Sequence, residues 1–136
     1  MQQLPGQIEI LSEFRQEMIA HARRDLPNEC CGLLIGTAGR IGRVVPMRST
    51  EPASDAYFMD PIQQVEVLTG MERQGEELIG IYHSHPRGPL EPSGMDLQLA
   101  FHPEAVYVIV SLGDPQHPDI GAFVLNDGRF RRIEIR

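Results

Sequence analysis

The chain has 136 residues, a mass of 15.2 kDa and 41% hydrophobic residues, a balance that predicts one globular domain over residues 1–136. Twelve basic residues, all of them arginine, stand against 19 acidic ones, and the net charge of −7 argues against nucleic acid as a partner. Apolar runs fall short of the roughly 18 residues of a membrane span, and no signal-peptide pattern is visible. Two adjacent cysteines, Cys30 and Cys31, suit a reducing compartment, so we expect a cytoplasmic protein.

The first half of the chain predicts a helix, a hairpin and a second helix. Residues 12–26 carry apolar side chains at every third or fourth position, which is typical of an amphipathic helix. The apolar segments 30–35 and 41–47 flank a glycine-containing turn and predict a β-hairpin. Residues 61–74 show helical periodicity again, with Asp60 as the expected cap and a proline in the first turn.

The second half predicts a buried strand, a short helix and three more strands. Residues 78–82 are continuously apolar, which favours a strand covered on both faces, and a proline-rich loop follows soon after. Ser93 is the expected cap of a helix over residues 94–101. Further strands are predicted at residues 105–112, 120–125 and 129–135. About three helices and about six strands together predict a mixed α/β (α+β) fold with a largely antiparallel central sheet.

The segment from His83 to Asp96 carries the chemistry. In an extended chain, residues i and i+2 point to the same side, so His83 and His85 can converge on one ion. Asp96 lies in the first turn of the next predicted helix, where the intervening loop can bring it back to the histidines. Two imidazoles and one carboxylate leave a fourth position for water, which is the pattern of a catalytic zinc site. Manganese and iron are open alternatives for the same ligands.

Both parts of this segment also have simpler interpretations. A pair of histidines one residue apart is common on protein surfaces and need not bind a metal. Ser93 and Asp96 have the spacing of a capping box at a helix N-terminus. The two readings are compatible, because a cap that fixes Ser93 and Asp96 also orients them towards the histidines. The residues alone leave both interpretations open.

The full spacing resembles a known motif. His83-x-His85, seven residues, then Ser93-x-x-Asp96 is similar to the JAMM (MPN+) motif of the Mov34/MPN/PAD-1 metallopeptidases. Upstream, Glu29 and the Cys-Gly-Leu-Leu-x-Gly stretch after it resemble the glutamate-bearing strand of that family. The resemblance extends over nearly the whole chain. It implies a single MPN/JAB domain with a cytidine-deaminase-like architecture.

The resemblance implies a role for each motif residue. His83, His85 and Asp96 would hold one Zn²⁺ per chain, with a water molecule as the fourth ligand. Glu29 would act as the general base that takes the proton of this water and passes it to the leaving amine. Ser93 would donate a hydrogen bond to the oxyanion. The reaction implied is hydrolysis of a peptide or isopeptide bond without a covalent intermediate.

The chain resembles the compact prokaryotic members of this family, because only 40 residues follow Asp96. Those members act on ubiquitin-like sulfur-carrier proteins, so we expect cleavage of an amide bond after a C-terminal Gly-Gly. Two alternatives are a RadC-like protein of DNA metabolism, which the net charge of −7 disfavours, and a non-catalytic MPN binding module. Exposed sheet edges leave a homodimer open. Cys30 and Cys31 are expected to be structural, with no role as nucleophiles.

Overall fold

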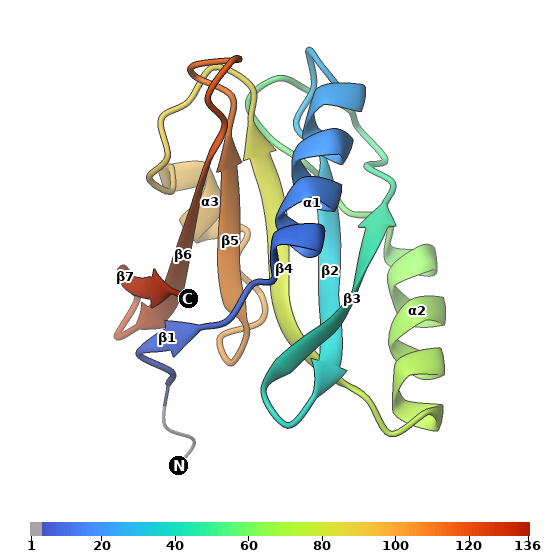
Figure 1. The fold of residues 1–136 in the computed structure, drawn as a ribbon. Helices are drawn as coiled ribbons and strands as arrows, with labels where there is room; N and C mark the ends of the chain where they lie inside the picture. Colours follow the sequence, from blue (N-terminus) through green and yellow to red (C-terminus); the bar gives the residue numbers. More distant parts are fainter. Residues whose placement is uncertain (1–3) are drawn as a thin grey trace.

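In the computed structural model, which describes residues 4–136, a mixed seven-stranded sheet lies between helices (Figure 1). The strand order is β1-β7-β6-β5-β4-β2-β3, with parallel pairing only for β1 with β7 and for β4 with β5 among the described residues. The elements are β1 (Gln7–Ile8), α1 (Ser12–Arg24), β2 (Cys31–Thr37), β3 (Arg40–Met47), α2 (Pro61–Arg73), β4 (Glu77–His85), α3 (Gly94–Gln98), β5 (Val106–Ser111), β6 (Asp119–Asn126) and β7 (Arg129–Ile135). The mixed, largely antiparallel fold expected from the sequence is confirmed.

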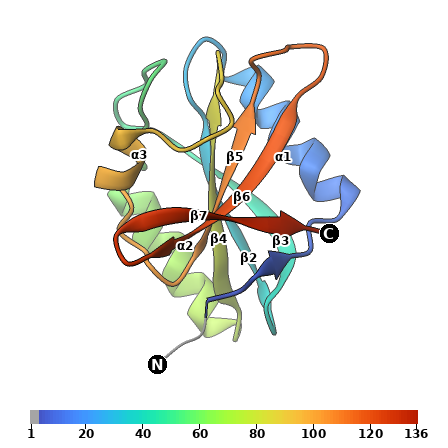
Figure 2. The same ribbon diagram turned by 90° about the vertical axis from the view of Figure 1, so that its left-hand side faces the viewer.

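Helices cover both faces of the sheet, as the view in Figure 2 shows: α1 lies on one side, α2 and α3 on the other. Successive side chains of the central strands therefore point alternately into two separate apolar clusters. On the α1 side, Met18 packs with Leu34 and Val108, and on the α2 side, Met71 packs with Leu33. Because both faces of the central strands are buried, their sequences are continuous apolar runs.

Three elements differ from the sequence prediction. The additional strand β1 has only two residues and pairs in parallel with β7, so it carries too little pattern to be predicted. Helix α3 ends at Gln98 instead of Phe101, and the remaining residues form a loop. Strand β4 is longer than residues 78–82, since it continues through both histidines to His85. No helix among residues 4–136 is long and apolar enough to span a membrane.

Strand β4 carries a buried polar contact on the side opposite the histidines. The hydroxyl of Tyr82 lies 2.7 Å from Nδ1 of His21, and Nε2 of His21 lies 3.3 Å from a carboxylate oxygen of Asp25. Burial lowers the pKa of His21 although the neighbouring Asp25 opposes this, so the imidazole is neutral and accepts the Tyr82 hydrogen bond. A Cβ on Gly32 would overlap the Tyr82 ring, so only glycine fits opposite it on β2. This contact fixes α1 to the centre of the sheet.

Substituting Tyr82→Phe should lower the free energy of unfolding by about 1–3 kcal/mol, because Nδ1 of buried His21 loses its donor. Urea denaturation monitored by circular dichroism measures the change. Tyr107→Phe is the matched control: its hydroxyl accepts from the His102 amide in a partly buried loop. Water can replace that contact, so the expected loss is smaller, about 0.5–1 kcal/mol. Equal losses for the two variants would contradict the structural role of the Tyr82 contact.

Candidate metal centre

The C-terminal end of β4 positions two imidazoles on one face of the sheet. His83 pairs with Cys31 of β2 on one side, and His85 lies opposite Ser111 of β5 on the other. Because side chains alternate along a strand, His83 and His85 point to the same face as Ile81, which packs in one cluster with Met71 of α2. Both are buried, with only 2% and 6% of their surfaces exposed. The spacing of His83 and His85 in the sequence therefore brings the two imidazoles together as a possible pair of ligands.

Helix α3 supplies the carboxylate through its capping box. The Asp96 amide donates to Oγ of Ser93 at 3.0 Å, and the Ser93 amide donates to Oδ2 of Asp96 at 2.8 Å. These two bonds fix the Asp96 side chain at the helix N-terminus, where a negative charge is also favoured by the helix dipole. Asp96, which the sequence predicts both as part of the capping box and as a ligand, therefore has the same orientation in both roles, while Ser93 belongs to the capping box and not to the ligand set.

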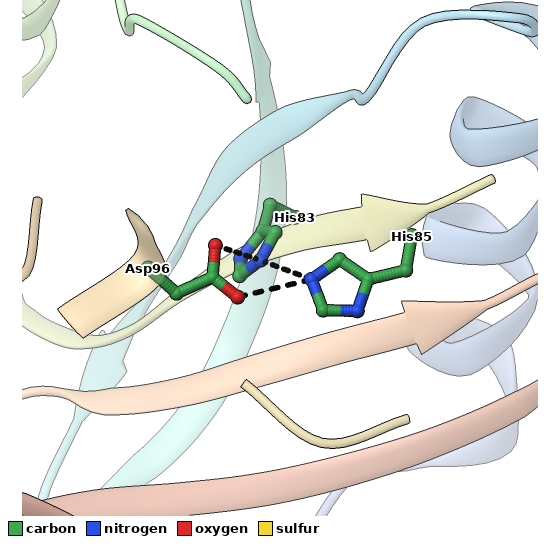
Figure 3. Close-up of side chains that lie close together, drawn as sticks. All are labelled: His83, His85 and Asp96. Carbon is green, nitrogen blue, oxygen red and sulfur yellow. Dashed lines mark hydrogen bonds and ion pairs between the residues drawn. The ribbon is translucent and has the colours of Figure 1, made fainter. Parts of the chain in front are cut away.

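The three side chains converge, as Figure 3 shows. Nε2 of His83 lies 3.1 Å from Oδ1 of Asp96, and Nε2 of His85 lies 3.0 Å from Oδ2. The two Nε2 atoms are 3.2 Å apart, and one ligand atom from each of the three residues falls within 4.8 Å of the others. Burial raises the pKa of Asp96, but hydrogen bonds from both histidines outweigh this and hold it well below its usual range. The carboxylate is thus charged at neutral pH.

The ring of His85 is oriented for metal binding by a backbone group. Its Nδ1 lies 2.6 Å from the carbonyl oxygen of Pro89, which can only accept, so Nδ1 carries the proton. In the neutral ring, the lone pair of Nε2 then faces the Asp96 carboxylate and Nε2 of His83. Such converging lone pairs repel one another unless a proton or a metal ion lies between them. Burial lowers the pKa of His85, but the hydrogen bonds to Asp96 and Pro89 raise it overall.

The ring of His83 is completely enclosed. It stacks on Tyr57 with ring centroids 4.9 Å apart and an interplanar angle of 31°. Burial lowers its pKa despite the neighbouring Asp96, which favours the neutral imidazole that metals require. Its Nδ1 is buried without a hydrogen-bond partner within residues 4–136.

Glu29 lies two residues before the start of β2 and lines a cavity of about 310 Å³ together with His85 and Ser93. Its amide donates to the carbonyl of Ala53 at 2.8 Å, and its side chain is 4% exposed. Oε1 is buried, and no group of the described residues hydrogen-bonds it. Burial raises the pKa of Glu29 to about 8, with His85 opposing and the carboxylate of Asp96 adding to the rise. A carboxyl group that titrates near neutral pH can both take up and release a proton.

The hydroxyl of Ser93 borders the same cavity as Glu29. Its oxygen accepts from the Asp96 amide, which leaves its own proton free to be donated. Ser93 is exposed, so a substrate can reach it. All five residues singled out in the sequence therefore gather around one end of β4.

The two cysteines lie on opposite faces of the sheet. Cys30 belongs to the cluster under α1 and Cys31 to the cluster under α2, and both are free thiols. Burial raises the pKa of each thiol to about 12. Neither is therefore a thiolate nucleophile at neutral pH.

The donor set fits a zinc ion. Two imidazole nitrogens and one carboxylate oxygen are ligands that zinc accepts in catalytic sites. The backbone carbonyl on His85 fixes its tautomer, as is usual for a zinc-binding histidine. Glu29, whose buried Oε1 has no hydrogen-bond partner within residues 4–136, lines the cavity next to this donor set.

Sequence reasoning missed two contributors to the site, the Pro89 carbonyl and the Tyr57 ring. The proline-rich loop after His85 predicts a turn, but it does not indicate which carbonyl meets the imidazole. Tyr57 lies in a segment without regular secondary structure and reaches His83 only through tertiary packing. We find no sequence signal that would have identified either contact.

Comparison with known proteins places this geometry in context. Residues 11–126 match the family described as prokaryotic homologs of the JAB domain. A "CysO-cysteine peptidase" of Mycobacterium tuberculosis is 39% identical over 121 residues, which cover 88% of this chain and 83% of the relative. A "Desampylase" of Haloferax volcanii is 34% identical over 114 residues, covering 78% of this chain and 81% of the relative. A "Probable TtuB-protein conjugate cleaving protease" of Thermus thermophilus is 40% identical over 86 residues, covering 62% and 57%.

The fold has close counterparts among solved structures. The solution structure of a protein from Desulfitobacterium hafniense superposes with a TM-score of 0.85 at 36% sequence identity, covering 95% of this chain and 91% of the other. A protein from Salinibacter ruber gives a TM-score of 0.71 at 26% identity, covering 94% and 89%. The sheet and helices described above are thus a recurring arrangement.

The metal-free protein should bind one zinc ion per chain and become more stable as a result. At a zinc concentration 100 times the dissociation constant, the expected stabilisation is about 2.7 kcal/mol. His83→Ala should abolish both the binding and the stabilisation. His117→Ala, a change at an exposed histidine that pairs with Asp114, should leave both intact. Titration calorimetry and thermal unfolding with and without zinc measure the effect, and equal binding by the two variants would contradict this assignment.

Proposed function

The chain belongs to the family of prokaryotic homologs of the JAB domain, and on that premise we propose that it is a zinc-dependent peptidase. Its substrate would be a ubiquitin-like sulfur-carrier protein, cleaved at the amide bond after a C-terminal Gly-Gly. One observation carries the proposal: His83, His85 and Asp96 converge beside a cavity that Glu29 and Ser93 line. Two free, buried cysteines support the cytoplasm as the compartment.

The three ligands would hold zinc, which when bound supplies a Lewis acid that polarises a carbonyl group and makes water more acidic. The chain itself holds these ligands in place before any metal binds. Asp96 is fixed by the Ser93 amide, and His85 by the Pro89 carbonyl. Such preorganisation reduces the cost of assembling the site.

Glu29 would be the general base and then the general acid. Its raised pKa, about 8, lies near neutral pH, so the carboxylate can accept a proton from an attacking water molecule. The same proton can then pass to the nitrogen of the leaving amine. Oε1 has no competing partner within residues 4–136, so it is available for this exchange.

Ser93 would stabilise the negative charge that develops on the carbonyl oxygen. Its hydroxyl oxygen is held by the Asp96 amide, while its proton remains free to be donated towards the cavity. A fixed donor of this kind stabilises the transition state more than the ground state.

The substrate class is supported by the relatives and by the motif. Relatives named for cleaving CysO-cysteine, TtuB-protein conjugates and, as a desampylase, a third kind of conjugate are 34–40% identical to this chain. The prokaryotic members that the motif resembles act on carriers with a flexible Gly-Gly tail. Glycine allows a backbone to approach a recessed metal closely, as His83 at 2% exposure requires. Whether two copies associate stays a prediction.

With zinc bound, the protein should cleave a carrier extended after its Gly-Gly tail, and Glu29→Gln should lower kcat by about 10²–10⁴-fold, because the proton acceptor is removed. Ser93→Ala should lower kcat by about 10²–10³-fold through loss of the oxyanion donor. Mass spectrometry of the carrier before and after incubation identifies the cleaved bond. Glu29→Gln should retain zinc, because Glu29 is outside the ligand set.

Glu72→Gln is the control for a change of glutamate that leaves the site untouched, since Glu72 is exposed on α2. It should retain full activity. A carrier whose tail ends in Ala-Ala should be cut poorly. If the zinc-loaded protein cleaves no Gly-Gly-tailed carrier, the proposal is wrong and a non-catalytic binding module becomes the better reading.

A further inference from the structure

Ser84 lies between the two histidines on β4 but is not one of the expected site residues. Strand alternation turns its side chain away from the metal site, to the side where Tyr82 contacts α1. It has no exposed surface, and a buried hydroxyl is retained at little cost only when it is hydrogen-bonded. Its Oγ accepts a hydrogen bond of 2.8 Å from the amide of Cys30.

This hydrogen bond closes the last rung between β2 and β4. The Ser84 amide donates to the Cys30 carbonyl at 3.2 Å, and the Cys30 amide returns a bond to the Ser84 hydroxyl. One pair beyond the regular ladder, which ends at Cys31 and His83, a side chain thus accepts the second hydrogen bond. These two hydrogen bonds join the end of β4 to the segment just before β2.

Glu29 immediately precedes Cys30 in the sequence. The amide of Glu29 donates to the carbonyl of Ala53, which lies in the loop between β3 and α2, so at Glu29 the pairing with β4 has ended. The backbone of Glu29 is therefore fixed between two hydrogen bonds, one to Ala53 and one from Cys30 to Ser84. The second joins the peptide group between Glu29 and Cys30 to the strand that carries His83 and His85, next to the bond from the Ser84 amide to the Cys30 carbonyl.

We propose that Ser84 is a positioning residue for Glu29, whose hydroxyl holds the start of β2 against the end of β4 at the proper distance from the metal ligands. Without the hydroxyl, the amide of Cys30, a residue only 1% exposed, has lost its acceptor and reaches water only if the strand end separates. Glu29 moves with it. The inference rests on the proposed function for the role of Glu29, whereas the hydrogen bond itself is independent of that role.

Hydrogen exchange in the metal-free protein tests the hydrogen bond between Cys30 and Ser84 without any activity measurement. In Ser84→Ala, the Cys30 amide should exchange at least about tenfold faster than in the parent, while amides in the middle of β2 change little. Ser111→Ala is the matched control, because Ser111 is a buried serine at the end of β5 whose Oγ accepts from the Gly113 amide. It should leave the Cys30 amide unchanged. Equal exchange in parent and Ser84→Ala would overturn the proposal.

Kinetics of the zinc-loaded enzyme test whether the Ser84 hydroxyl positions Glu29. Ser84→Ala should lower kcat by about 10²-fold, as expected for a catalytic group displaced by about 1 Å. KM and zinc affinity should stay within about twofold of the parent, since neither depends on Glu29. Ser84→Thr retains the acceptor and should restore most of kcat, and Ser111→Ala should leave kcat unchanged.

A double variant separates positioning of Glu29 from a general structural effect. In a Glu29→Gln background, Ser84→Ala should cost less than about threefold, because it acts only through Glu29. A full additional loss, or a parallel loss of zinc affinity, would show that Ser84 acts on the ligand strand and would overturn the proposal. If the parent cleaves no Gly-Gly-tailed carrier, the proposed function fails, while the exchange measurement still decides whether Ser84 holds the strand.

Discussion

The shared carboxylate of Asp96 is the interaction on which the candidate site depends. One oxygen accepts from the Ser93 amide at 2.8 Å and lies 3.0 Å from Nε2 of His85, and the other lies 3.1 Å from Nε2 of His83. Both histidines come from one strand, so the strand backbone places both side chains on the same face. The carboxylate comes from a separate five-residue helix, α3, whose capping box fixes its orientation. The capping box and the proposed metal site therefore depend on the same carboxylate orientation.

The sheet explains why the site forms at this end of β4 and not elsewhere along it. Strand β4 lies between antiparallel β2 and parallel β5, and its middle is buried by helices on both faces. Parallel strands end on the same side of a sheet, and the crevice beyond their carboxyl ends is where open α/β sheets bind ligands. At His85 the strand ends and the loop to α3 begins, which leaves space for the cavity lined by Glu29 and Ser93. The same alternation that fills two apolar clusters places His83 and His85 on one side and Ser84 on the other.

Local sequence patterns predicted the parts of this arrangement that depend on local geometry. The alternation of His83 and His85 and the capping box of Ser93 and Asp96 follow from strand and helix geometry over a few residues, and the structure shows both. Contacts between distant segments left no such pattern. The hydrogen bond of Cys30 to Ser84 spans 54 positions, and the stacking of Tyr57 on His83 depends on a loop without periodicity. The role proposed for Glu29 rests on resemblance to a family, because nothing in its spacing distinguishes it from the other glutamates.

Three consecutive residues show how burial directs the chemistry. Glu29, Cys30 and Cys31 are all at most 4% exposed, and burial raises the pKa of each. For the two thiols the result, about 12, leaves them protonated and unreactive at neutral pH. For the carboxyl group the result, about 8, brings titration into the neutral range where proton transfer is most effective. The same physical effect that argues against the cysteines as nucleophiles is therefore consistent with the proposed roles of Glu29 as the acid–base group and of water as the attacking species.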